Sequence, residues 1–468
     1  MIPFLPRHIA TRGIYIYIVS LALVSVLYVR YAMPVWRMGL GLAFVTGFFL
    51  LTSRWSKVWT FRKRRQFEST LFFIAVVLRL IWVVGSYFYY IQVVGQPFEF
   101  LDMDSQAYHE SGAWLASTPW SVTWDYYFRY GLEPISDAGY PIYLSLVYRL
   151  FGPVIIIPRI IKCFLSAWMC LLLYRLSARL MGEAQGRMAG IMCCLMPNLI
   201  IYCGYNLKET EMIFLEVAFL ERLDYLLRKK NYLFLDIGLP IVLAGSLFLF
   251  RNVLGAIAVF TFATGVLISN AQSMKTGTKR AILIAFSVLF LTVIGGTTIK
   301  SEVEKYWEGR YENVETKRDI QTKAGNKWAQ YATGTVMAPM IFVLPFSTMV
   351  DIEGQYVQLT KHGGNYIRNF MAFFVLIGLY ELIRQKKYRP HLFLLIFFIG
   401  YLMVIAVSGF SNSERFLLPG LPGLIMMWSY GVSELNVKTY KYFPLWCVLV
   451  VVMELAWAFF KLGSRGLL

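Results

Sequence analysis

Long apolar runs separated by short polar connections dominate the chain. About thirteen of these runs have the length of a membrane-spanning helix, which needs roughly 20 mostly apolar residues. A membrane β-barrel is excluded, because its strands alternate in polarity instead of staying apolar over such lengths. The pattern therefore predicts an all-α polytopic membrane protein. The runs cover residues 14–30, 39–53, 69–93, 154–178, 187–204, 210–227, 232–249, 252–270, 281–297, 367–384, 390–409, 416–433 and 442–462.

Basic residues in the connections predict how the chain is oriented in the bilayer. If the N-terminus is cytoplasmic, every even-numbered connection is basic, as the positive-inside rule requires. We therefore expect a multi-pass protein of the plasma (bacterial inner) membrane with a cytoplasmic N-terminus. The basic residues are Arg54, Lys57, Arg62, Lys63, Arg64 and Arg65; Arg175, Arg179 and Arg187; Arg228, Lys229 and Lys230; Lys275, Lys279 and Arg280; Arg384, Lys386, Lys387 and Arg389; and Lys438 and Lys441.

The composition agrees with a membrane protein. Of the 468 residues, 58% are hydrophobic and 15% are charged, which is far from the balance of a soluble domain. The net charge of +18 would suggest nucleic acid in a soluble protein. Here the basic excess lies in the connections, so we expect the lipid bilayer as a partner and no nucleic acid. The six cysteines lie within or beside apolar runs, which indicates buried thiols and no disulfide framework.

Two long connections fall on the predicted outer side, at residues 94–153 and 298–366. Each contains a further apolar stretch, at 139–152 and at 336–350. If either stretch spanned the membrane, later basic connections would move to the outside, so we interpret both as interfacial or re-entrant segments. Long loops attached to a membrane bundle often carry function, and these two loops are where we expect it.

Acidic residues open the first long connection. This connection begins directly after the third apolar run, and Asp102 and Asp104 lie near its start. The stretch 105–116 mixes apolar and polar residues and predicts a short helix capped by Asp104 or Ser105. A cap role alone is the simplest interpretation of Asp104, but other chemistry-bearing residues fall on the same predicted side.

Several short motifs follow one another in order along residues 69–433. They are Asp104-Ser105-Gln106-Ala107-Tyr108, Gly139-Tyr140-Pro141, Pro197 to Tyr202 followed by Lys208-Glu209, Arg251, and Glu414-Arg415-Phe416 followed by Pro419 and Pro422. This ordered set resembles the polytopic GT-C glycosyltransferases, in particular the protein-mannosyltransferase-like and aminoarabinose-transferase-like branch, whose members read D-E-x-x-Y and then G-Y-P.

The resemblance implies a GT-C fold with two large extracytoplasmic loops that bear short interfacial helices, and a catalytic membrane domain at 69–433. Two spans precede the one that normally comes first, so residues 1–68 form an N-terminal accessory hairpin with a basic cytoplasmic loop. Residues 434–468 then form a C-terminal transmembrane helix. Ser105 stands where the family has an acid, and Asp102 adds a D-x-D pattern. Both departures leave open which acid is the base and whether a metal binds.

The expected roles follow from the chemistry of sugar transfer. A carboxylate must take the proton of the acceptor hydroxyl, and cations must stabilise the leaving phosphate. We expect Asp104 or Asp102 as the base, and Tyr108, His109 and Tyr140 as acceptor or loop support. A divalent cation (Mg or Mn) on Asp102 and Asp104 is an alternative, since hard metals prefer clustered carboxylate oxygens. The expected donor-phosphate contacts are Lys208, Glu209, Arg251 and Arg415.

Each cation also has a simpler interpretation. Lys208 suits a snorkelling residue, Arg251 an interfacial anchor, and Arg415 an ion pair with its neighbour Glu414. Arg79 lies near the middle of a predicted span, where a charge is costly unless it is paired inside the protein, so we expect a structural role for it.

The sequence therefore predicts an inverting membrane glycosyltransferase. It would move a sugar from a polyprenyl-phosphate donor to a glycan, lipid or protein acceptor, with the active site on the extracytoplasmic face. One rival is a glycan polymerase or ligase that uses polyprenyl-diphosphate-linked glycans. A flippase of lipid-linked sugars is less favoured, because transporters usually show paired breaks in two similar halves and this chain shows no such repeat.

Overall fold

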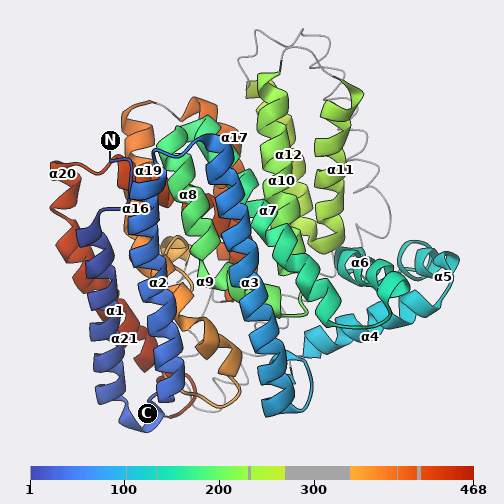
Figure 1. The fold of residues 1–468 in the computed structure, drawn as a ribbon, viewed down its shortest axis with the longest axis horizontal. Helices are drawn as coiled ribbons and strands as arrows, with labels where there is room; N and C mark the ends of the chain where they lie inside the picture. The colour runs from blue at the N-terminus through green and yellow to red at the C-terminus, as the bar shows by residue number, and fades with distance from the viewer. Residues whose placement is uncertain are drawn as a thin grey trace.

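The computed structural model describes residues 2–101, 103–132, 134–229, 233–268, 338–386, 388–407 and 413–467. Nearly all of these residues are helical (Figure 1). Within the described residues, the one strand-like pairing is a single bridge between Ala32 and Val350. The predicted all-α class is confirmed for this part of the chain.

Seven helices of the described chain are long and apolar enough to cross a membrane, which confirms a polytopic membrane protein. Two further helices, α8 (Glu183–Leu195) and α9 (Pro197–Ile201), belong to a pair bent by 52°, which raises the number to eight if the pair is one span. The seven are α1 (Arg7–Leu27), α2 (Val35–Trp59), α3 (Arg64–Val94), α7 (Ile156–Met181), α16 (Tyr356–Arg384), α18 (Glu414–Leu417) with α19 (Leu421–Ser433), and α20 (Val437–Tyr440) with α21 (Phe443–Gly463).

The predicted count of about thirteen spans is not confirmed. Helices α11 (Phe234–Phe250), α12 (Asn252–Ile268) and α17 (Leu392–Val407) coincide with predicted spans, but they have only 16 or 17 residues. Helix α10 (Glu209–Arg228) has 20 residues but carries several acids, and the predicted span at 281–297 lies outside the described residues.

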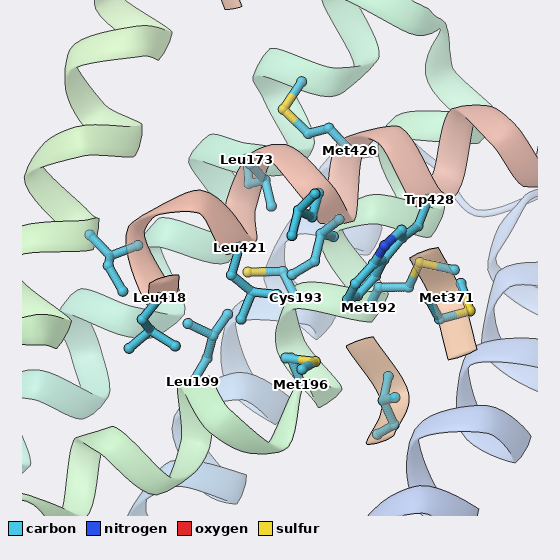
Figure 2. Close-up of a cluster of buried hydrophobic side chains, with 14 of the residues drawn as sticks. Leu173, Met192, Cys193, Met196, Leu199, Met371, Leu418, Leu421, Met426 and Trp428 are labelled. Atoms are coloured by element: carbon cyan, nitrogen blue, oxygen red, sulfur yellow. The ribbon is translucent and has the colours of Figure 1, made fainter. Parts of the chain in front are cut away.

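Buried apolar side chains hold the long helices together. Figure 2 shows one such cluster, where Leu173 of α7, Met192 and Cys193 of α8, Met371 of α16 and Trp428 of α19 pack against one another. All six cysteines are described, and all are free and buried, as expected. Packing of this kind stabilises membrane helices through dispersion contacts.

Small residues allow α16 and α19 to approach closely. A Cβ atom at Gly431 would lie 1.8 Å from the carbonyl oxygen of Phe374, and one at Gly378 would lie 2.9 Å from the Met427 side chain. No larger residue fits at Gly431 without moving a helix. Interfaces between membrane helices commonly use small residues in this way.

The N-terminal helices pack directly on the rest of the bundle. Helix α1 contacts α2 and α21, and α2 contacts α8 and α16. The Tyr17 hydroxyl lies 2.7 Å from Nε2 of His362 on α16, and the Tyr366 hydroxyl donates to the carbonyl of Gly13 at 2.6 Å. The predicted accessory hairpin at 1–68 is therefore in contact with the predicted catalytic part, and the boundaries at 68/69 and 433/434 stay predictions.

The first long connection, predicted at 94–153, forms short helices. These are α4 (Met103–Ser117), α5 (Trp120–Trp124), the π-helical turn η3 (Asp125–Arg129) and α6 (Ile135–Phe151). Figure 1 shows α4, α5 and α6 across one end of the bundle, with α5 projecting sideways. The apolar stretch 139–152 lies mostly within α6, which packs on α4 and is not among the span-like helices.

Two predicted boundaries need correction here. Helix α4 begins at Met103, so Asp104 lies in its first turn and not at its cap. Helix α16 begins at Tyr356, which places its first turns inside the connection predicted at 298–366. Most of that connection lies outside the described residues; from residue 338 to 355 the chain has only one short 3-10 turn, Ala338–Met340, and no spanning helix.

Successive long helices run in alternating directions. The connections that follow α2, α7, α10 and α16 therefore lie at the end of the bundle away from α4, α5 and α6, near the N-terminus in Figure 1. These are four of the basic connections singled out in the sequence. The grouping of basic residues at one end agrees with the predicted topology, and which end faces the cytoplasm stays a prediction.

Candidate functional site

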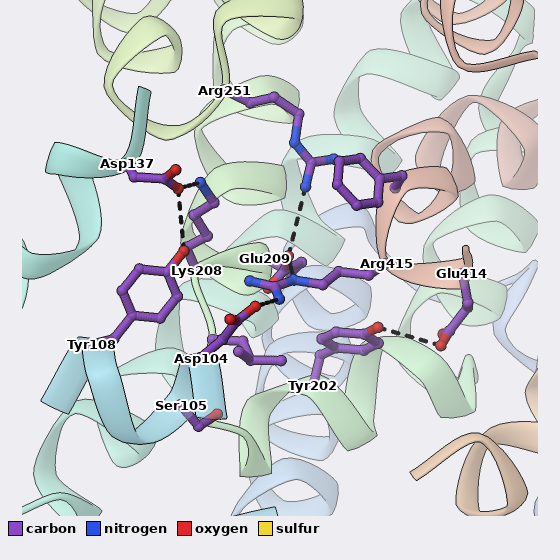
Figure 3. Close-up of polar contacts among 12 residues, drawn as sticks. Asp104, Ser105, Tyr108, Asp137, Tyr202, Lys208, Glu209, Arg251, Glu414 and Arg415 are labelled. Carbon is purple, nitrogen blue, oxygen red and sulfur yellow. Dashed lines mark hydrogen bonds and ion pairs between the residues drawn. The ribbon is translucent and has the colours of Figure 1, made fainter. Parts of the chain in front are cut away.

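Charged residues from four distant segments meet at the end of the bundle covered by α4 and α6 (Figure 3). They come from the first turn of α4, the start of α10, the junction between α11 and α12, and α18. Among them are Asp104, Lys208, Glu209, Arg251 and Arg415, all predicted as site residues. The structure thus brings these five together.

Arg415 links two carboxylates. Its Nη1 group contacts Oδ2 of Asp104, and its Nε group donates to Oε1 of Glu209. The Asp104 side chain is 60% exposed, whereas that of Glu209 is fully buried. The guanidinium therefore lies between an acid that solvent reaches and an acid that solvent does not reach.

Arg251 approaches the same buried acid from the other side. Its Nη2 atom lies 3.7 Å from Oε1 of Glu209, and its Nη1 group donates to the Tyr401 hydroxyl at 2.8 Å. The guanidinium also lies over the ring of Phe416, 4.4 Å from its centroid. Arg251 is buried and faces protein groups, so it is not an interfacial anchor.

Lys208 belongs to a second ion pair. Its ammonium contacts Oδ1 of Asp137 and the carbonyl of Ser136, and the Tyr108 hydroxyl donates to the same Asp137 oxygen at 3.2 Å. Burial lowers the pKa of the Lys208 ammonium, and the Asp137 carboxylate opposes this shift. Lys208 is buried, so it does not snorkel to the membrane surface.

The start of α10 is held by a buried lysine from α7. The Nζ group of Lys162 donates to the carbonyls of Tyr205 (2.9 Å) and Leu207, and it lies 3.5 Å from Oε2 of Glu211. Glu209 and Glu211 lie in the first turn of α10, where the helix dipole favours negative charge. These contacts fix the loop that presents Lys208 and Glu209.

Glu414 makes a separate set of contacts. It pairs with Lys361 of α16 and accepts hydrogen bonds from Nδ2 of Asn198 at 2.5 Å and from the Tyr202 hydroxyl at 3.3 Å. Lys361 donates to the Tyr202 hydroxyl at 3.1 Å. Arg415 is therefore not paired with its sequence neighbour, contrary to the simplest interpretation.

The three predicted support residues surround this core of charges. The ring of Tyr108 packs edge-on against Tyr140, whose hydroxyl donates to Oδ1 of Asn206 at 2.9 Å. Burial raises the pKa of Tyr108 and Tyr140 above the ordinary value. Nδ1 of His109 lies 2.8 Å from the Tyr148 hydroxyl, farther along α6; burial lowers the pKa of His109.

Arg79 is buried in the bundle and makes hydrogen bonds to neutral groups. It donates to the Ser166 hydroxyl at 2.7 Å and to the carbonyls of Ala75 and Cys194 at 3.2 Å. These bonds join α3, α7 and α8, which agrees with the expected structural role. It also donates to the carbonyl of Cys193 and to the thiol of Cys170, and among the described residues no carboxylate lies within ion-pair distance of it.

Potential metal ligands were predicted at Asp102 and Asp104. No three potential ligands among the described residues lie close enough to share a metal, and Asp104 and Glu209 already contact a guanidinium. Asp102, the other half of the D-x-D pattern, lies outside the described residues. Of the two carboxylates that were expected to hold a metal, the structure therefore describes only Asp104.

Sequence reasoning missed several residues of the site. Asp137 comes two residues before the Gly139 motif, but nothing in the sequence distinguishes it from a surface acid at the start of a helix. Lys162 and Glu211 lie within predicted spans, and charges at such positions were the available signal. Glu99, which was not singled out either, is buried and accepts a hydrogen bond from the Ser105 hydroxyl.

Comparisons with known proteins add no further assignment. No protein-family model matches the sequence, and no curated protein matches it either.

Proposed function

We propose that this protein is an inverting membrane glycosyltransferase of the GT-C type. It transfers a sugar from a polyprenyl-phosphate donor to a hydroxyl of a glycan, lipid or protein acceptor on the extracytoplasmic face. The observation that carries the proposal is the half-exposed Asp104 in contact with Arg415, which Glu209 connects to Arg251. A carboxylate that solvent reaches thus lies beside the partly buried Arg415, which Glu209 connects to the buried Arg251.

The reaction needs one displacement at the anomeric carbon. Asp104 removes the proton of the acceptor hydroxyl while its oxygen attacks the anomeric carbon from the side opposite the phosphate. The bond from the anomeric carbon to the phosphate oxygen breaks, and the lipid phosphate leaves with the electron pair. A single displacement inverts the configuration of the sugar.

Arg415 and Arg251 are suited to receive the leaving phosphate. Guanidinium groups bind phosphate oxygens through paired, charge-assisted hydrogen bonds. Both arginines now contact carboxylates, so a donor phosphate that enters beside Arg415 competes with Asp104 for its N–H groups. This exchange would free a carboxylate oxygen of Asp104 at the moment when the acceptor arrives.

The location at one end of the bundle supports a lipid-linked donor. The site lies at the end of the bundle opposite the basic connections. The positive-inside rule assigns the basic connections to the cytoplasm, and therefore the site to the outer face. A donor with its tail among the helices could present its phosphate there without leaving the bilayer. We propose in addition that the protein lies in the plasma membrane and that the site faces outward.

The direct test is transfer by the purified protein in lipid nanodiscs. We expect sugar transfer from a polyprenyl-phosphate donor, and Asp104→Asn should reduce turnover about 10²–10⁴-fold while donor binding persists. Asp236→Asn is a matched control, because Asp236 also forms an ion pair with a basic residue, Lys229, but at the α10–α11 connection.

Other outcomes of this assay separate the proposal from its rivals. Transfer only from diphosphate-linked glycans would favour a polymerase or ligase. Movement of the lipid-linked sugar across the bilayer without any transfer would favour a flippase. Full turnover by the Asp104→Asn variant would show that Asp104 is not the base.

A further inference from the structure

Two consecutive residues of α18 face opposite sides of the site. Arg415 contacts Asp104 and Glu209, whereas Glu414 contacts Lys361, Asn198 and Tyr202. Helix α18 (Glu414–Leu417) is the first turn of a helical segment that continues into α19 as far as Ser433, and its N-cap residue makes no side-chain cap hydrogen bond. The end of a helix frays unless it is held, so contacts with other elements help to fix the position of this first turn.

The contacts of Glu414 supply this fixation. Oε1 accepts from Nδ2 of Asn198 at 2.5 Å, Oε2 accepts from the Tyr202 hydroxyl at 3.3 Å, and the carboxylate pairs with Lys361. Asn198 also donates to Oδ1 of Asn365 at 2.9 Å. The partners belong to α9, the turn after it and α16, and all of them are buried.

We propose that Glu414 and Lys361 form a latch that positions the guanidinium of Arg415 for the donor phosphate. The backbone of residue 414 is fixed by the latch, and residue 415 follows directly, so the latch restricts where the guanidinium can reach. Both latch residues are positioning residues that act through Arg415. This inference rests on the proposed function, because it assigns Arg415 to the phosphate.

The latch between Glu414 and Lys361 is a buried ion pair. Removing one partner leaves an uncompensated buried charge, whereas replacing both with neutral residues of similar size often keeps the fold. Leu417 and Leu418 are also buried beside the latch, so packing can hold the segment in the bundle without it. The ion pair then adds precision of position more than attachment.

The test compares the latch in two backgrounds. Lys361→Met with Glu414→Gln removes both charges, and it is made in the natural protein and in an Arg415→Met variant. The probe is a polyprenyl phosphate in nanodiscs, measured by equilibrium binding. If the latch acts through Arg415, it should weaken binding about tenfold in the natural background and leave binding unchanged in the Arg415→Met background.

A matched control uses a second ion pair of α16, the helix that carries Lys361. Glu381 and Arg384 pair at 2.7 Å near the other end of α16, so Glu381→Gln with Arg384→Met should leave lipid binding unchanged. Equal losses in both Arg415 backgrounds would overturn the latch and indicate a general effect on the fold. No loss in either background would overturn it as well.

A second readout does not depend on the ligand. Cysteine introduced at Arg415 is labelled by a water-soluble maleimide with and without the latch replacements, against a background of six buried thiols. The latch predicts faster labelling once it is removed, and unchanged labelling would contradict it. Failure of the natural protein to bind any polyprenyl phosphate would instead contradict the proposed function, and the labelling would still decide the latch.

Discussion

Arg415 makes contacts that a single ammonium group could not reproduce. Its Nη1 and Nε groups reach two carboxylates, Asp104 and Glu209, which come from α4 and α10. The planar guanidinium with several N–H donors allows this, whereas a lysine has one charged nitrogen. The identity of the side chain at this position is therefore part of the geometry of the site.

Arg415→Lys should weaken donor binding even though the charge is kept. Each lost charge-assisted hydrogen bond costs on the order of 1.5–3 kcal/mol, which corresponds to a factor of about ten or more. The measurement is equilibrium binding of a polyprenyl phosphate in nanodiscs. Arg129→Lys is the control, because Arg129 is exposed and lies 3.6 Å from Asp125 in a surface pair; equal binding by Arg415→Lys would mean that only the charge matters.

At the residue scale, the sequence indicated which charged residues stand out better than it indicated which residues they contact. Asp104, Lys208, Arg251 and Arg415 stand out because they interrupt or flank apolar runs. Their partners are set by helix packing, so the pairing of Lys208 with Asp137 could not be predicted. For the same reason the simpler alternative, in which Arg415 pairs with Glu414, was wrong, since adjacent helical residues point in different directions.

Helix α10 carries the site at its first turn, and its neighbour α7 holds it there. Lys162 of α7 donates to two carbonyls of the preceding loop and lies near Glu211. Tyr205 and Leu207 are buried, so without the ammonium their carbonyls would lose this donor. The element that presents Lys208 and Glu209 is thus anchored by a charge in the bundle.

Lys162→Met should destabilise the protein and loosen the start of α10. An unsatisfied buried polar group costs about 1–3 kcal/mol, and the replacement leaves two carbonyls and one acid without their donor. Thermal unfolding in nanodiscs measures the loss. Lys461→Met is the control, because its ammonium contacts the side-chain amides of Gln355 and Gln358 at the start of α16 and the ring of Trp457, and no backbone carbonyl is among these contacts; a similar loss there would contradict a special role of Lys162.

Among the elements, the long apolar helices were predictable and the irregular ones were not. Apolarity and length locate α3, α7 and α21 within a few residues. The break between α8 and α9 falls at Pro197, which lacks a backbone N–H donor, but the 52° bend depends on packing. The early start of α16 at Tyr356 was missed because its first turns, as far as Asn365, are rich in polar residues and do not continue the apolar run.

At the scale of the whole molecule, the two ends of the bundle differ in the charged residues that they carry. Basic connections gather at one end, and the acid-bearing helices α4 and α6 cover the other. The sequence predicted this separation from the order of runs and connections. The number of spans was harder to predict, because α11, α12 and α17 are short and α10 is charged.

Labelling of cysteines that are introduced at the two ends of the bundle should confirm the orientation of the protein in the membrane. A cysteine at Ser117, at the end of α4, should react with an impermeant maleimide added outside intact cells. A cysteine at Phe61, which is 91% exposed in the α2–α3 connection, should react only after the membrane is opened. Labelling of both positions from outside would contradict the topology and, with it, the extracytoplasmic site.

The central claim is that Arg415 and Arg251 hold a lipid-linked phosphate beside Asp104. The most direct measurement is an experimental structure of the Asp104→Asn variant in a lipid nanodisc with a bound polyprenyl-phosphate sugar. We predict that the phosphate lies within hydrogen-bond distance of both guanidinium groups, with the anomeric carbon facing residue 104. A bound donor elsewhere in the bundle, with Arg415 still paired to Glu209 and no phosphate near it, would contradict the claim.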